Sequence, residues 1–551
     1  MKLSMYEPRI EKGDIYFHHP GQPIDLSYNH DVDVVKFKGK YFAAWNANVS
    51  HLEDVPGQYN FLAVSDDYRS WSAPIRPFMT EAGCENPIDD DNQWQPIFIN
   101  WKDEKLFCAW CTFTGRKVFV SESTDGLHWK NVEVENAPNA LLGKACGFPT
   151  NHGIVSSKGV MMFPSCVPFT NTERCIVGNT LFSGILMSDN GGASWFWSDP
   201  IEAMSWKDVG EDTALFGEKI SLWEPSIYEM PDGTFGLLIR NSTSQDAPEK
   251  ADKSHRMLLY ATSADHGKTW TKARPVELDT ICSRNVTLSG ETSRDSLFMV
   301  LNDWHVNIPK RISFDRYFLS LFASPVNDPD LLLPGPVVQP AGACAFYPNA
   351  FVENGKMYIA YTYPKNMLWA VVHELPDFSK PFLMPRGART AVEKEDGYFR
   401  FRQRETTLSL VLTKKLTEAE RVTLSFDSML NRYTGDPFPI LTLGGKTRNG
   451  TVLRARYDAE KKSDVLEIRT GDETWEYAAS VMMKSWNRIV IDMTKTDFGI
   501  SVNGESEKRF AIALLRKIAF GGLYEAPVWP IGTGWGCDMM LKNDTIDIRS
   551  N

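Results

Sequence analysis

Short apolar segments separated by polar turns run through the first 385 residues of the chain. One unit occurs six times: an apolar segment, a turn containing Gly or Asp, and a second apolar segment. An example is EPSIYEMPDGTFGLLIR, and the copies begin at Asp31, Trp94, His152, Glu224, Asn285 and Tyr347. A hairpin repeated at intervals of about 60 residues is typical of β-propeller blades. The pattern therefore predicts an all-β fold with a six-bladed β-propeller of four-stranded units over residues 1–385.

A second repeated word falls between these hairpins. It reads SADHGKTW at 263–270, and shorter or altered copies occur at 188–195, 123–129 and 65–71, each after an apolar segment. Ser and Asp side chains bond nearby backbone amides, Gly adopts positive φ, and Trp packs the turn onto the next strand. We therefore expect Asp265 and Trp270 to close a blade and to have a structural role.

The pattern changes after the propeller. Alternating strand patterns such as RVTLSFD, TVLRARYD, RIVIDMT and FGISVNG follow one another over residues 401–551. Such a series predicts an antiparallel β-sandwich as a second domain, with residues 386–400 as the linker.

Composition narrows the class of protein. The chain is 42% hydrophobic and 23% charged, as in ordinary globular proteins. Its net charge of −11 argues against nucleic acid as a partner, because a phosphate backbone requires a basic surface. We find neither a signal-peptide pattern nor an apolar run long enough for a membrane span. With nine cysteines, an odd number, in mostly apolar contexts, we expect a cytoplasmic protein without a membrane partner.

The SxDxGxTW word resembles the Asp-box of sialidases and related propeller proteins, and the likeness covers about the first 385 residues. The Asp-box implies a propeller and does not by itself imply an activity. The second domain resembles the concanavalin-like modules appended to many glycosidases. That likeness implies an accessory role in sugar binding, in completing the substrate cleft or in contact with a second copy of the chain.

The candidate site follows from the geometry of a propeller, in which the innermost strands of all blades begin around one funnel mouth. Titratable and aromatic side chains gather at these strand starts. They are His30, Asp31, Trp94, Gln95, His152, Glu224, Arg284, Asn285 and Tyr347. Arg240 ends the strand after the one that Glu224 opens, so a hairpin returns it to the same edge.

The resemblance to sialidases assigns roles to some of these residues. Sialidases open a strand with a glutamate, end the next with an arginine, and place an arginine and then a nucleophilic tyrosine in the last two blades. This implies Tyr347 as nucleophile, Glu224 as its base, and Arg240 and Arg316 as carboxylate ligands. The acid is implied in the loop HLEDVPGQ, at Asp54, with Glu53 and His51 as rivals.

One departure from the family pattern bears on the substrate. Sialidases open the first blade with an Arg-Ile-Pro motif whose arginine completes a clamp of three. This chain has Asn29, His30 and Asp31 there. The clamp then consists of Arg240 and Arg316, with either His30 or Arg284 as the third member.

Three functions remain open from the sequence. The first is an exo-glycoside hydrolase that removes a terminal acidic sugar, with Asp31, Trp94, Gln95 and Arg284 as substrate-binding residues. The second is a polysaccharide lyase acting on a uronate-containing glycan of the rhamnosyl-glucuronate or ulvan type. There His30, His152 and Tyr347 would move protons, and Arg240 and Arg316 would neutralise the carboxylate. The third is a glycan-binding propeller without activity.

Other assignments are weaker. Fructan and arabinan hydrolases would pair Asp31 with Glu224, but their five-bladed propellers disagree with six repeats. No cofactor is required by the sequence, although the acidic run from Asp89 to Asp91 is a candidate for calcium or for substrate hydroxyls. We expect an oligosaccharide or glycan as substrate and the second domain as the contact surface of any homo-oligomer.

Overall fold

The structure is a computed structural model of the chain. The residues it describes are 3–17, 25–53, 55–89, 92–112, 117–135, 147–168, 181–205, 207–208, 222–241, 257–279, 283–291, 294–303, 316, 318–339, 344–363, 367–386, 392–403, 407–432, 438–444, 450–470, 473–477, 483–514, 516–521 and 536–550.

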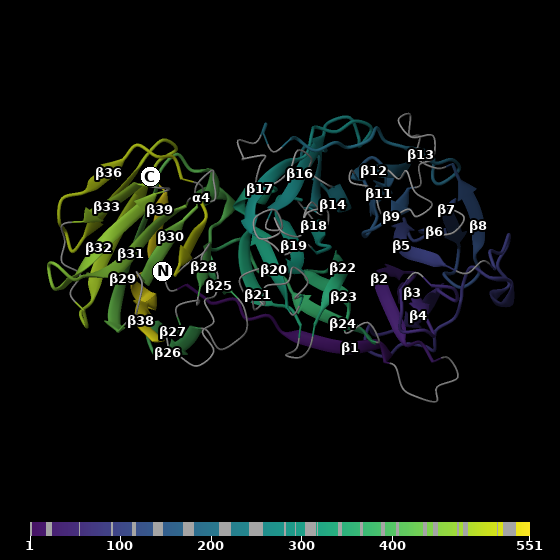
Figure 1. The fold of residues 1–551 in the computed structure, drawn as a ribbon, viewed down its shortest axis with the longest axis horizontal. Coiled ribbons are helices and arrows are strands. Elements are labelled where there is room, and N and C mark those ends of the chain that lie inside the picture. The colour runs from purple at the N-terminus through teal and green to yellow at the C-terminus, as the bar shows by residue number, and fades with distance from the viewer. Residues whose placement is uncertain are drawn as a thin grey trace.

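Six antiparallel sheets follow one another around a ring, as the repeats predicted (Figure 1). The first blade contains β2(Tyr28–Phe37), β3(Lys40–Asn48) and β4(Tyr59–Ser65). The second contains β5(Gln93–Trp101), β6(Lys105–Thr112), β7(Lys117–Ser123) and β8(Lys130–Val134). The third contains β9(Phe148–Pro149), β10(Ile154–Val155), β11(Met161–Pro168), β12(Leu181–Ser188) and β13(Phe196–Trp197).

The fourth and fifth blades are four-stranded, and the sixth is completed by the first strand of the chain. The fourth blade contains β14(Leu222–Glu229), β15(Phe235–Asn241), β16(Met257–Ser263) and β17(Arg274–Asp279). The fifth contains β18(Val286–Ser289), β19(Leu297–Asn302), β20(Leu319–Ser324) and β21(Leu333–Val337). The sixth contains β22(Phe346–Glu353), β23(Lys356–Thr362) and β24(Met367–Glu374) together with β1(Ile10–Phe17).

Two blades depart from the predicted four strands. In the first, the outer position holds an isolated bridge between Leu62 and Ile75 in place of a strand. Pro74 and Pro77 flank Ile75, and proline cannot donate to a strand ladder. In the third, the inner strand is interrupted between β9 and β10, and His152 lies in that interruption.

The ring is closed by β1, which pairs antiparallel with β24 from Ile10↔His373 to Phe17↔Met367. Gly13 of β1 lies so close to the first blade that a Cβ there would be 2.6 Å from Cα of Arg69. The first strand thus connects the sixth blade to the first and holds the two ends of the ring together.

The apolar core lies between neighbouring blades. Each cluster of buried side chains draws on two adjacent sheets; one joins Trp45 of β3 to Leu368 of β24, and another joins Phe42 to Phe98 of β5. Because the inner strands bury both faces, almost every residue of β2 and β14 is buried. The blades are therefore stabilised by face-to-face packing around the ring.

The turns after the third strands share one hydrogen-bond pattern. At 263–270 the Asp265 carboxylate accepts from the backbone N–H and the hydroxyl of Thr269, and Trp270 Nε1 donates to the Gly267 carbonyl. The turn at 123–129 repeats this with Asp125, whose carboxylate accepts from two following N–H groups. These contacts agree with the structural role expected for Asp265 and Trp270.

His373 provides a pH-dependent contact between the fifth and sixth blades. The ring is buried, its Nε2 donates a 2.5 Å hydrogen bond to the Val338 carbonyl, and burial lowers its pKa from 6.5 to about 4, although that hydrogen bond acts in the opposite direction. The folded state then binds the proton less tightly than the unfolded chain. The contribution of neutral His373 to the free energy of unfolding is complete above pH 6.5 and is lost as the pH falls toward 4.

We expect His373→Gln to flatten this pH dependence. Lowering the pH from about 7 to about 5 should cost the wild type roughly 1–2 kcal/mol more free energy of unfolding than the variant. Urea denaturation at the two pH values measures this difference. The exposed His51, replaced by Gln, is the control and should leave the slope unchanged; equal slopes for His373→Gln and wild type would contradict the assignment.

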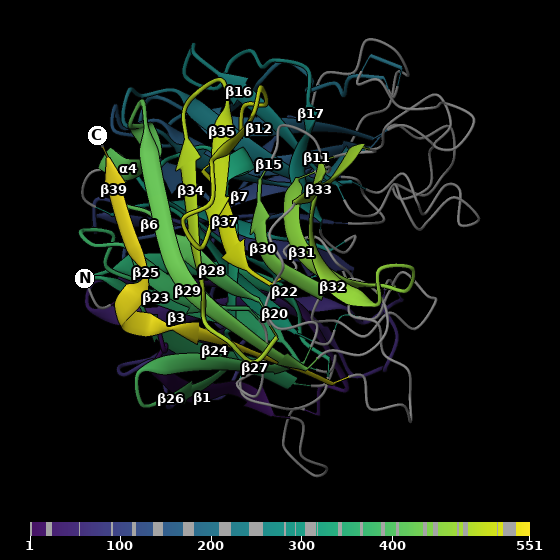
Figure 2. The same ribbon diagram turned by 90° about the vertical axis from the view of Figure 1, so that its left-hand side faces the viewer.

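The second domain is built from two antiparallel sheets (Figure 2). One has the order β25(Phe382–Pro385), β28(Leu408–Val411), β37(Ile518–Phe520), β30(Phe438–Leu443), β31(Thr451–Asp458), β32(Ser463–Thr470) and β33(Glu473–Tyr477). The other has the order β26(Val392–Glu395), β27(Tyr398–Gln403), β38(Gly536–Lys542), β29(Val422–Arg432), β34(Asn487–Met493), β35(Phe498–Val502) and β36(Lys508–Phe510), with β39(Asp547–Ser550) beside β29.

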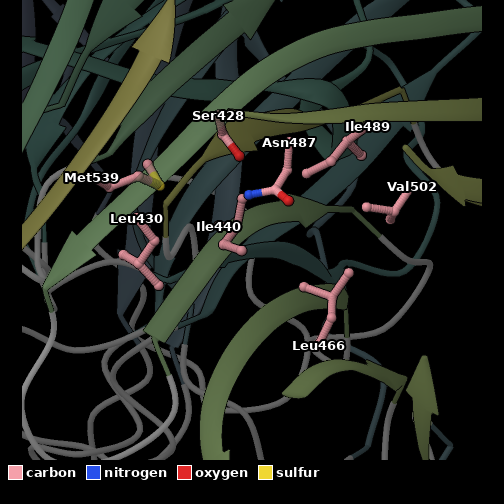
Figure 3. A pocket seen from close by; sticks show the side chains of 8 residues that line it. All are labelled: Ser428, Leu430, Ile440, Leu466, Asn487, Ile489, Val502 and Met539. Carbon is pink, nitrogen blue, oxygen red and sulfur yellow. The ribbon is translucent and has the colours of Figure 1, made fainter. Parts of the chain in front are cut away.

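A single apolar core joins the two sheets. Phe426 of β29 and Phe520 of β37 meet edge to face at 5.1 Å, although they belong to different sheets. A cavity of about 10 Å³ lies within this core and is lined from both sheets (Figure 3). That volume is about the size that one water molecule requires. The likeness to concanavalin-like modules stays a prediction.

Strand pairing crosses the predicted boundary between the propeller and the C-terminal segment. Phe382–Pro385, expected at the end of the propeller, pairs with β28 of the second domain. The predicted linker 386–400 contains β26 and the start of β27, which pair with each other. The sequence concealed this because VEKE and its neighbours are charged and partly exposed, so they lack an apolar strand pattern.

The two domains are in direct contact. Arg386 donates two hydrogen bonds of 2.8 Å to the buried Asp303 of the fifth blade. The Ser409 hydroxyl bonds to the Pro334 carbonyl, and Val411 packs in a cluster shared with the last two blades. Within the described residues, no helix is long and apolar enough to cross a membrane.

Candidate functional site

The inner strands of four blades begin with the same distortion. Residues of β2, β5, β14 and β22 take a left-handed backbone conformation where the register shifts; they are Asp31 (φ 55°), Gln95 (φ 46°), Glu224 (φ 46°) and Tyr347 (φ 56°). Non-glycine residues rarely adopt this conformation, and each instance costs on the order of 1–3 kcal/mol. Strain retained at the same place in four blades, in residues with functional side chains, indicates a site at this end of the channel.

A buried ion pair and a tyrosine form the centre of this site. Arg240 Nη1 donates 2.6 Å to Glu224 Oε2 and 3.0 Å to the Tyr347 hydroxyl. Glu224 is 1% exposed and Arg240 2%. Arg240 reaches them because β15 returns antiparallel to β14 and pairs it with Trp223, the neighbour of Glu224. The three groups come from the fourth and sixth blades, which are separated in the ring by the fifth.

Further groups surround the Tyr347 ring. The Arg316 guanidinium lies 5.2 Å and the Arg284 guanidinium 5.7 Å from the ring centre. The His30 ring meets it edge on at 4.3 Å, and His30 Nδ1 lies 3.1 Å from the Thr362 hydroxyl. The tyrosine thus stands among three arginines and a histidine.

The electrostatics keep this phenol protonated in the free protein. Burial raises the pKa of Tyr347, the negative charge of Glu224 raises it further, Arg240 and Arg316 oppose the shift, and Asp31 adds to it. At neutral pH the side chain is therefore a neutral phenol. It becomes a nucleophile only if a base removes the proton during the reaction.

Arg284 forms the floor beneath this centre. Its Nη1 donates 3.0 Å to Asp31 and its Nε 2.7 Å to Asn151, while Asn151 donates to the carbonyls of Glu224 and Pro225. Arg284 is fully buried. It therefore supports residues of three other blades, the first, third and fourth, and its side chain lies below the surface of the site.

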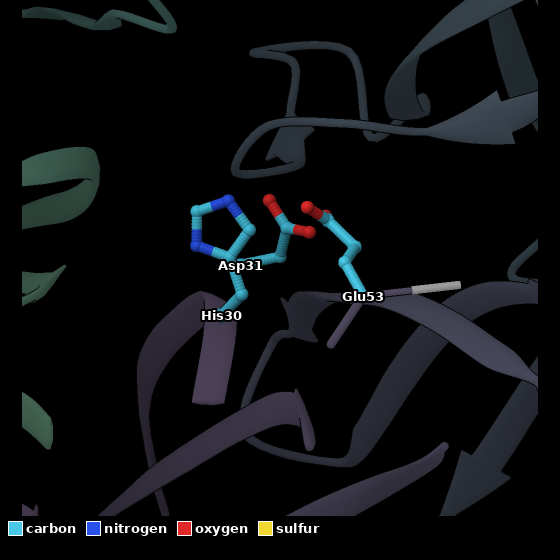
Figure 4. Close-up of side chains that lie close together, drawn as sticks. All are labelled: His30, Asp31 and Glu53. Atoms are coloured by element: carbon cyan, nitrogen blue, oxygen red, sulfur yellow. The ribbon is translucent and has the colours of Figure 1, made fainter. Parts of the chain in front are cut away.

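His30, Asp31 and Glu53 come together at the edge of the site (Figure 4). A nitrogen of His30 and a carboxylate oxygen from each acid lie within 4.8 Å of one another, a geometry that could hold a metal ion. However, Asp31 already accepts from Arg284 and, with the Asn46 amide turned to satisfy both groups, from Asn46 at 3.1 Å. The charge of Asp31 is thus balanced by a guanidinium, so we assign no metal here.

The expected acid, Asp54, lies outside the described residues. Of its two rivals, His51 is exposed, whereas Glu53 reaches His30 and Asp31. In the acidic run proposed for calcium, Asp89 accepts from the backbone N–H and hydroxyl of Thr80, and both contacts lower the pKa of Asp89. Asp90 and Asp91 lie outside the described residues.

Two residues expected at the mouth lie elsewhere. His152 sits in the break of the third inner strand, where its backbone N–H donates to Asn349 and its Nδ1 lies 2.9 Å from Asp33. Asn349 follows Tyr347 by two residues, and Asp33 follows Asp31 by two residues. His152 therefore lies further along the channel than Tyr347 and Asp31. Trp94 packs edge to face on Phe148 at 6.1 Å in the core between the second and third blades.

Several residues around the site escaped sequence reasoning. They are Asn46, Asn151, Cys166 and Thr362; the Cys166 thiol accepts the backbone N–H of Glu224 at 2.9 Å, and burial raises the pKa of this thiol. Of these, Asn151 could most easily have been found from the sequence, because a polar pair in TNHG interrupts a segment that should be an apolar inner strand. The other three lie in second strands or their ends, where the repeats gave no functional expectation.

The closed ring of six blades is similar to the fold of solved sialidases. Trypanosoma rangeli sialidase matches with a TM-score of 0.50 at 11% identity, over 99% of this chain and 97% of that one. The same enzyme in complex with 2,3-difluoro-KDN matches with 0.50 at 12% identity, over 98% and 97%.

A protein of unknown function from Dyadobacter fermentans is also similar, with a TM-score of 0.49 and 15% identity over 67% of this chain and 99% of that chain. No family profile and no curated protein matches the sequence. At these identities the structural likeness establishes the fold, and activity must be argued from the site itself.

Proposed function

We propose that the protein is a sialidase-like exo-glycoside hydrolase that removes a terminal acidic sugar from a glycan. The observation that carries the proposal is the Arg240 guanidinium, which bonds to both the Glu224 carboxylate and the Tyr347 hydroxyl in a buried site. An arginine in this position orients the base and the phenol toward each other and stabilises the phenolate that forms.

The reaction follows from these groups. The phenol oxygen of Tyr347 attacks the anomeric carbon while Glu224 takes its proton, the glycosidic carbon–oxygen bond breaks, and an acid protonates the leaving oxygen. Water then attacks the same carbon and gives a proton to the conjugate base of that acid, while the bond from this carbon to the Tyr347 oxygen breaks and Glu224 returns its proton to the phenolate. For the acid we propose Asp54, as expected from the sequence, or its rival Glu53, whose carboxylate lies near His30 and Asp31. The mechanism requires no cofactor.

The charge around the site favours an acidic sugar. Arg240 and Arg316 flank the tyrosine, and guanidinium groups bind carboxylates in bidentate geometry. The first blade supplies Asp31, paired with Arg284, where sialidases supply an arginine. We therefore propose a substrate that presents its carboxylate to Arg240 and Arg316, and a hydroxyl or amide donor to the side of Asp31 and Gln95.

One contact favours a lyase as the second candidate. His30 lies against the Tyr347 ring at 4.3 Å, so an imidazole and a phenol lie in contact beside two arginines. In a lyase one of them would remove the proton at C5 of a uronate and the other would protonate the leaving oxygen. His152 has no place in that reaction, since its ring bonds to Asp33 further along the channel.

The test is mass spectrometry of the products from sialylated, ketodeoxy-sugar and uronate-bearing oligosaccharides. Products that together have gained one water support the hydrolase. Fragments that sum to the intact substrate and include an unsaturated uronate would replace it by the lyase. Tight binding without turnover across the panel would leave a glycan-binding propeller.

For the second domain we propose an accessory role, as in glycosidases that carry a concanavalin-like module. Its attachment to the fifth blade through Arg386 and Asp303 is buried, and the strand β25 leads directly from the propeller into its sheet. This attachment supports a fixed rather than a tethered module, available for cleft completion or contact with a second copy.

A further inference from the structure

A second cavity lies at the opposite end of the channel from Tyr347. Its volume is about 390 Å³, and residues from the inner strands of all six blades line it; they include Val35, Ile99, Val155, Ile227, Leu288 and Phe351. On β22 it begins four residues after Tyr347, which corresponds to about 13 Å along a strand. The cavity shares none of its lining residues with the site around Tyr347.

The imidazole ring of His152 lines this cavity, and its contact with Asp33 fixes the orientation of the ring. Asp33 is fully buried and accepts from the backbone N–H groups of Val34 and Phe98 as well as lying 2.9 Å from His152 Nδ1. Because this carboxylate acts as an acceptor, Nδ1 carries the proton. In the neutral form of the ring, Nε2 is then a hydrogen-bond acceptor.

Both cations of the cavity lining are paired with carboxylates. Lys36 bonds to Glu353 at 2.7 Å, and Arg294 to Glu229 at 2.9 Å. Glu291 accepts from the backbone N–H groups of Asn354 and Gly355. The three carboxylates exceed the two cations by one, so the described lining leaves no unpaired cation to attract an anion, and the remaining wall is largely aliphatic. Its character is that of a small-molecule pocket with one fixed polar group.

We propose that this cavity is a second binding site, for a neutral ring molecule that bears hydroxyl groups. One hydroxyl of the ligand donates to His152 Nε2, and an apolar ring face packs against Leu288 and Phe351. A monosaccharide and a phenol both have this chemistry. The inference goes beyond the proposed function and does not depend on it.

The experiment uses the full chain with D-galactose and phenol as separate probes at millimolar concentration. The readout is the imidazole NMR signal of His152, identified by its loss in His152→Phe. We expect at least one probe to shift this signal in a saturable manner. Leu288→Trp, which fills the cavity without touching His152, should weaken binding at least about tenfold; that factor corresponds to 1.4 kcal/mol.

The matched control is Leu127→Trp, the same substitution at a leucine that is 44% exposed on the outside of the second blade. It should leave the shift unchanged. A shift with galactose alone identifies a sugar as the ligand class, and one with phenol alone an aromatic alcohol. If neither probe shifts His152, or if the shift persists in Leu288→Trp, the proposal is wrong, whatever the glycan panel shows at Tyr347.

Discussion

Replacing Tyr347 by Phe is expected to lower kcat/KM on the acidic glycan substrate by about 10³-fold or more. The variant keeps the ring that lies against His30 and Arg316 and loses only the oxygen bonded to Arg240. If that oxygen attacks the sugar, its loss removes the covalent route, and an effect of this size follows. Steady-state kinetics on the substrate found in the panel measures it.

Tyr361→Phe is the matched control. Tyr361 lies in the same blade, on β23, and its ring is fully buried in the core between the last two blades. Loss of its hydroxyl should change stability slightly and leave kcat/KM near the wild-type value. A Tyr347→Phe variant with full kcat would exclude the nucleophile, and one with raised KM alone would reduce Tyr347 to a binding residue.

The second large effect is expected on stability, from Arg284→Met. The Arg284 side chain is fully buried and bonds to Asp31, whose side chain is 4% exposed. Removing one partner of such a pair leaves a buried, uncompensated charge, which costs about 3–5 kcal/mol of unfolding free energy. Urea denaturation monitored by tryptophan fluorescence measures the loss.

Two variants make this prediction specific to the buried pair. Adding Asp31→Asn to Arg284→Met should recover part of the lost stability, because the uncompensated charge is then removed. Arg274→Met breaks the more accessible pair with Asp330, in which the Arg274 side chain is 41% exposed, and should cost at most about 1 kcal/mol. Equal losses for Arg274→Met and Arg284→Met would show that the guanidinium of Arg284 has no special role.

Much of the propeller could be predicted from the chain because each blade repeats one local pattern. The hairpins that begin at Asp31, Glu224 and Tyr347 were found from their turns and spacing alone, and each is a β-hairpin in the structure. The role of β1 was not predicted. Its pairing with β24 joins segments about 350 residues apart, and no local pattern records a contact of that kind.

The candidate site could be predicted only as far as its strand starts. Hairpin geometry predicted that Arg240 lies near Glu224, the common mouth of the inner strands predicted that Tyr347 joins them, and the structure brings the three side chains together. The left-handed conformation of Glu224 and Tyr347 could not be predicted, because glycine, the usual signal of positive φ, is absent at both positions. The displacement of His152 had a signal, the polar pair in TNHG, but its effect on strand continuity required the three-dimensional pairing of β9 and β10.

The pairing of β1 with β24 also constrains when the protein can fold during synthesis. About 350 residues separate the two strands, so at roughly 5–20 residues per second the ribosome needs on the order of 20–70 s to supply the partner of β1. For that interval the edge of β1 that later pairs with β24 is available to strands of other chains. The charged and exposed residues of β1, Glu11 and Asp14 among them, discourage such pairing and keep this strand available until β24 emerges.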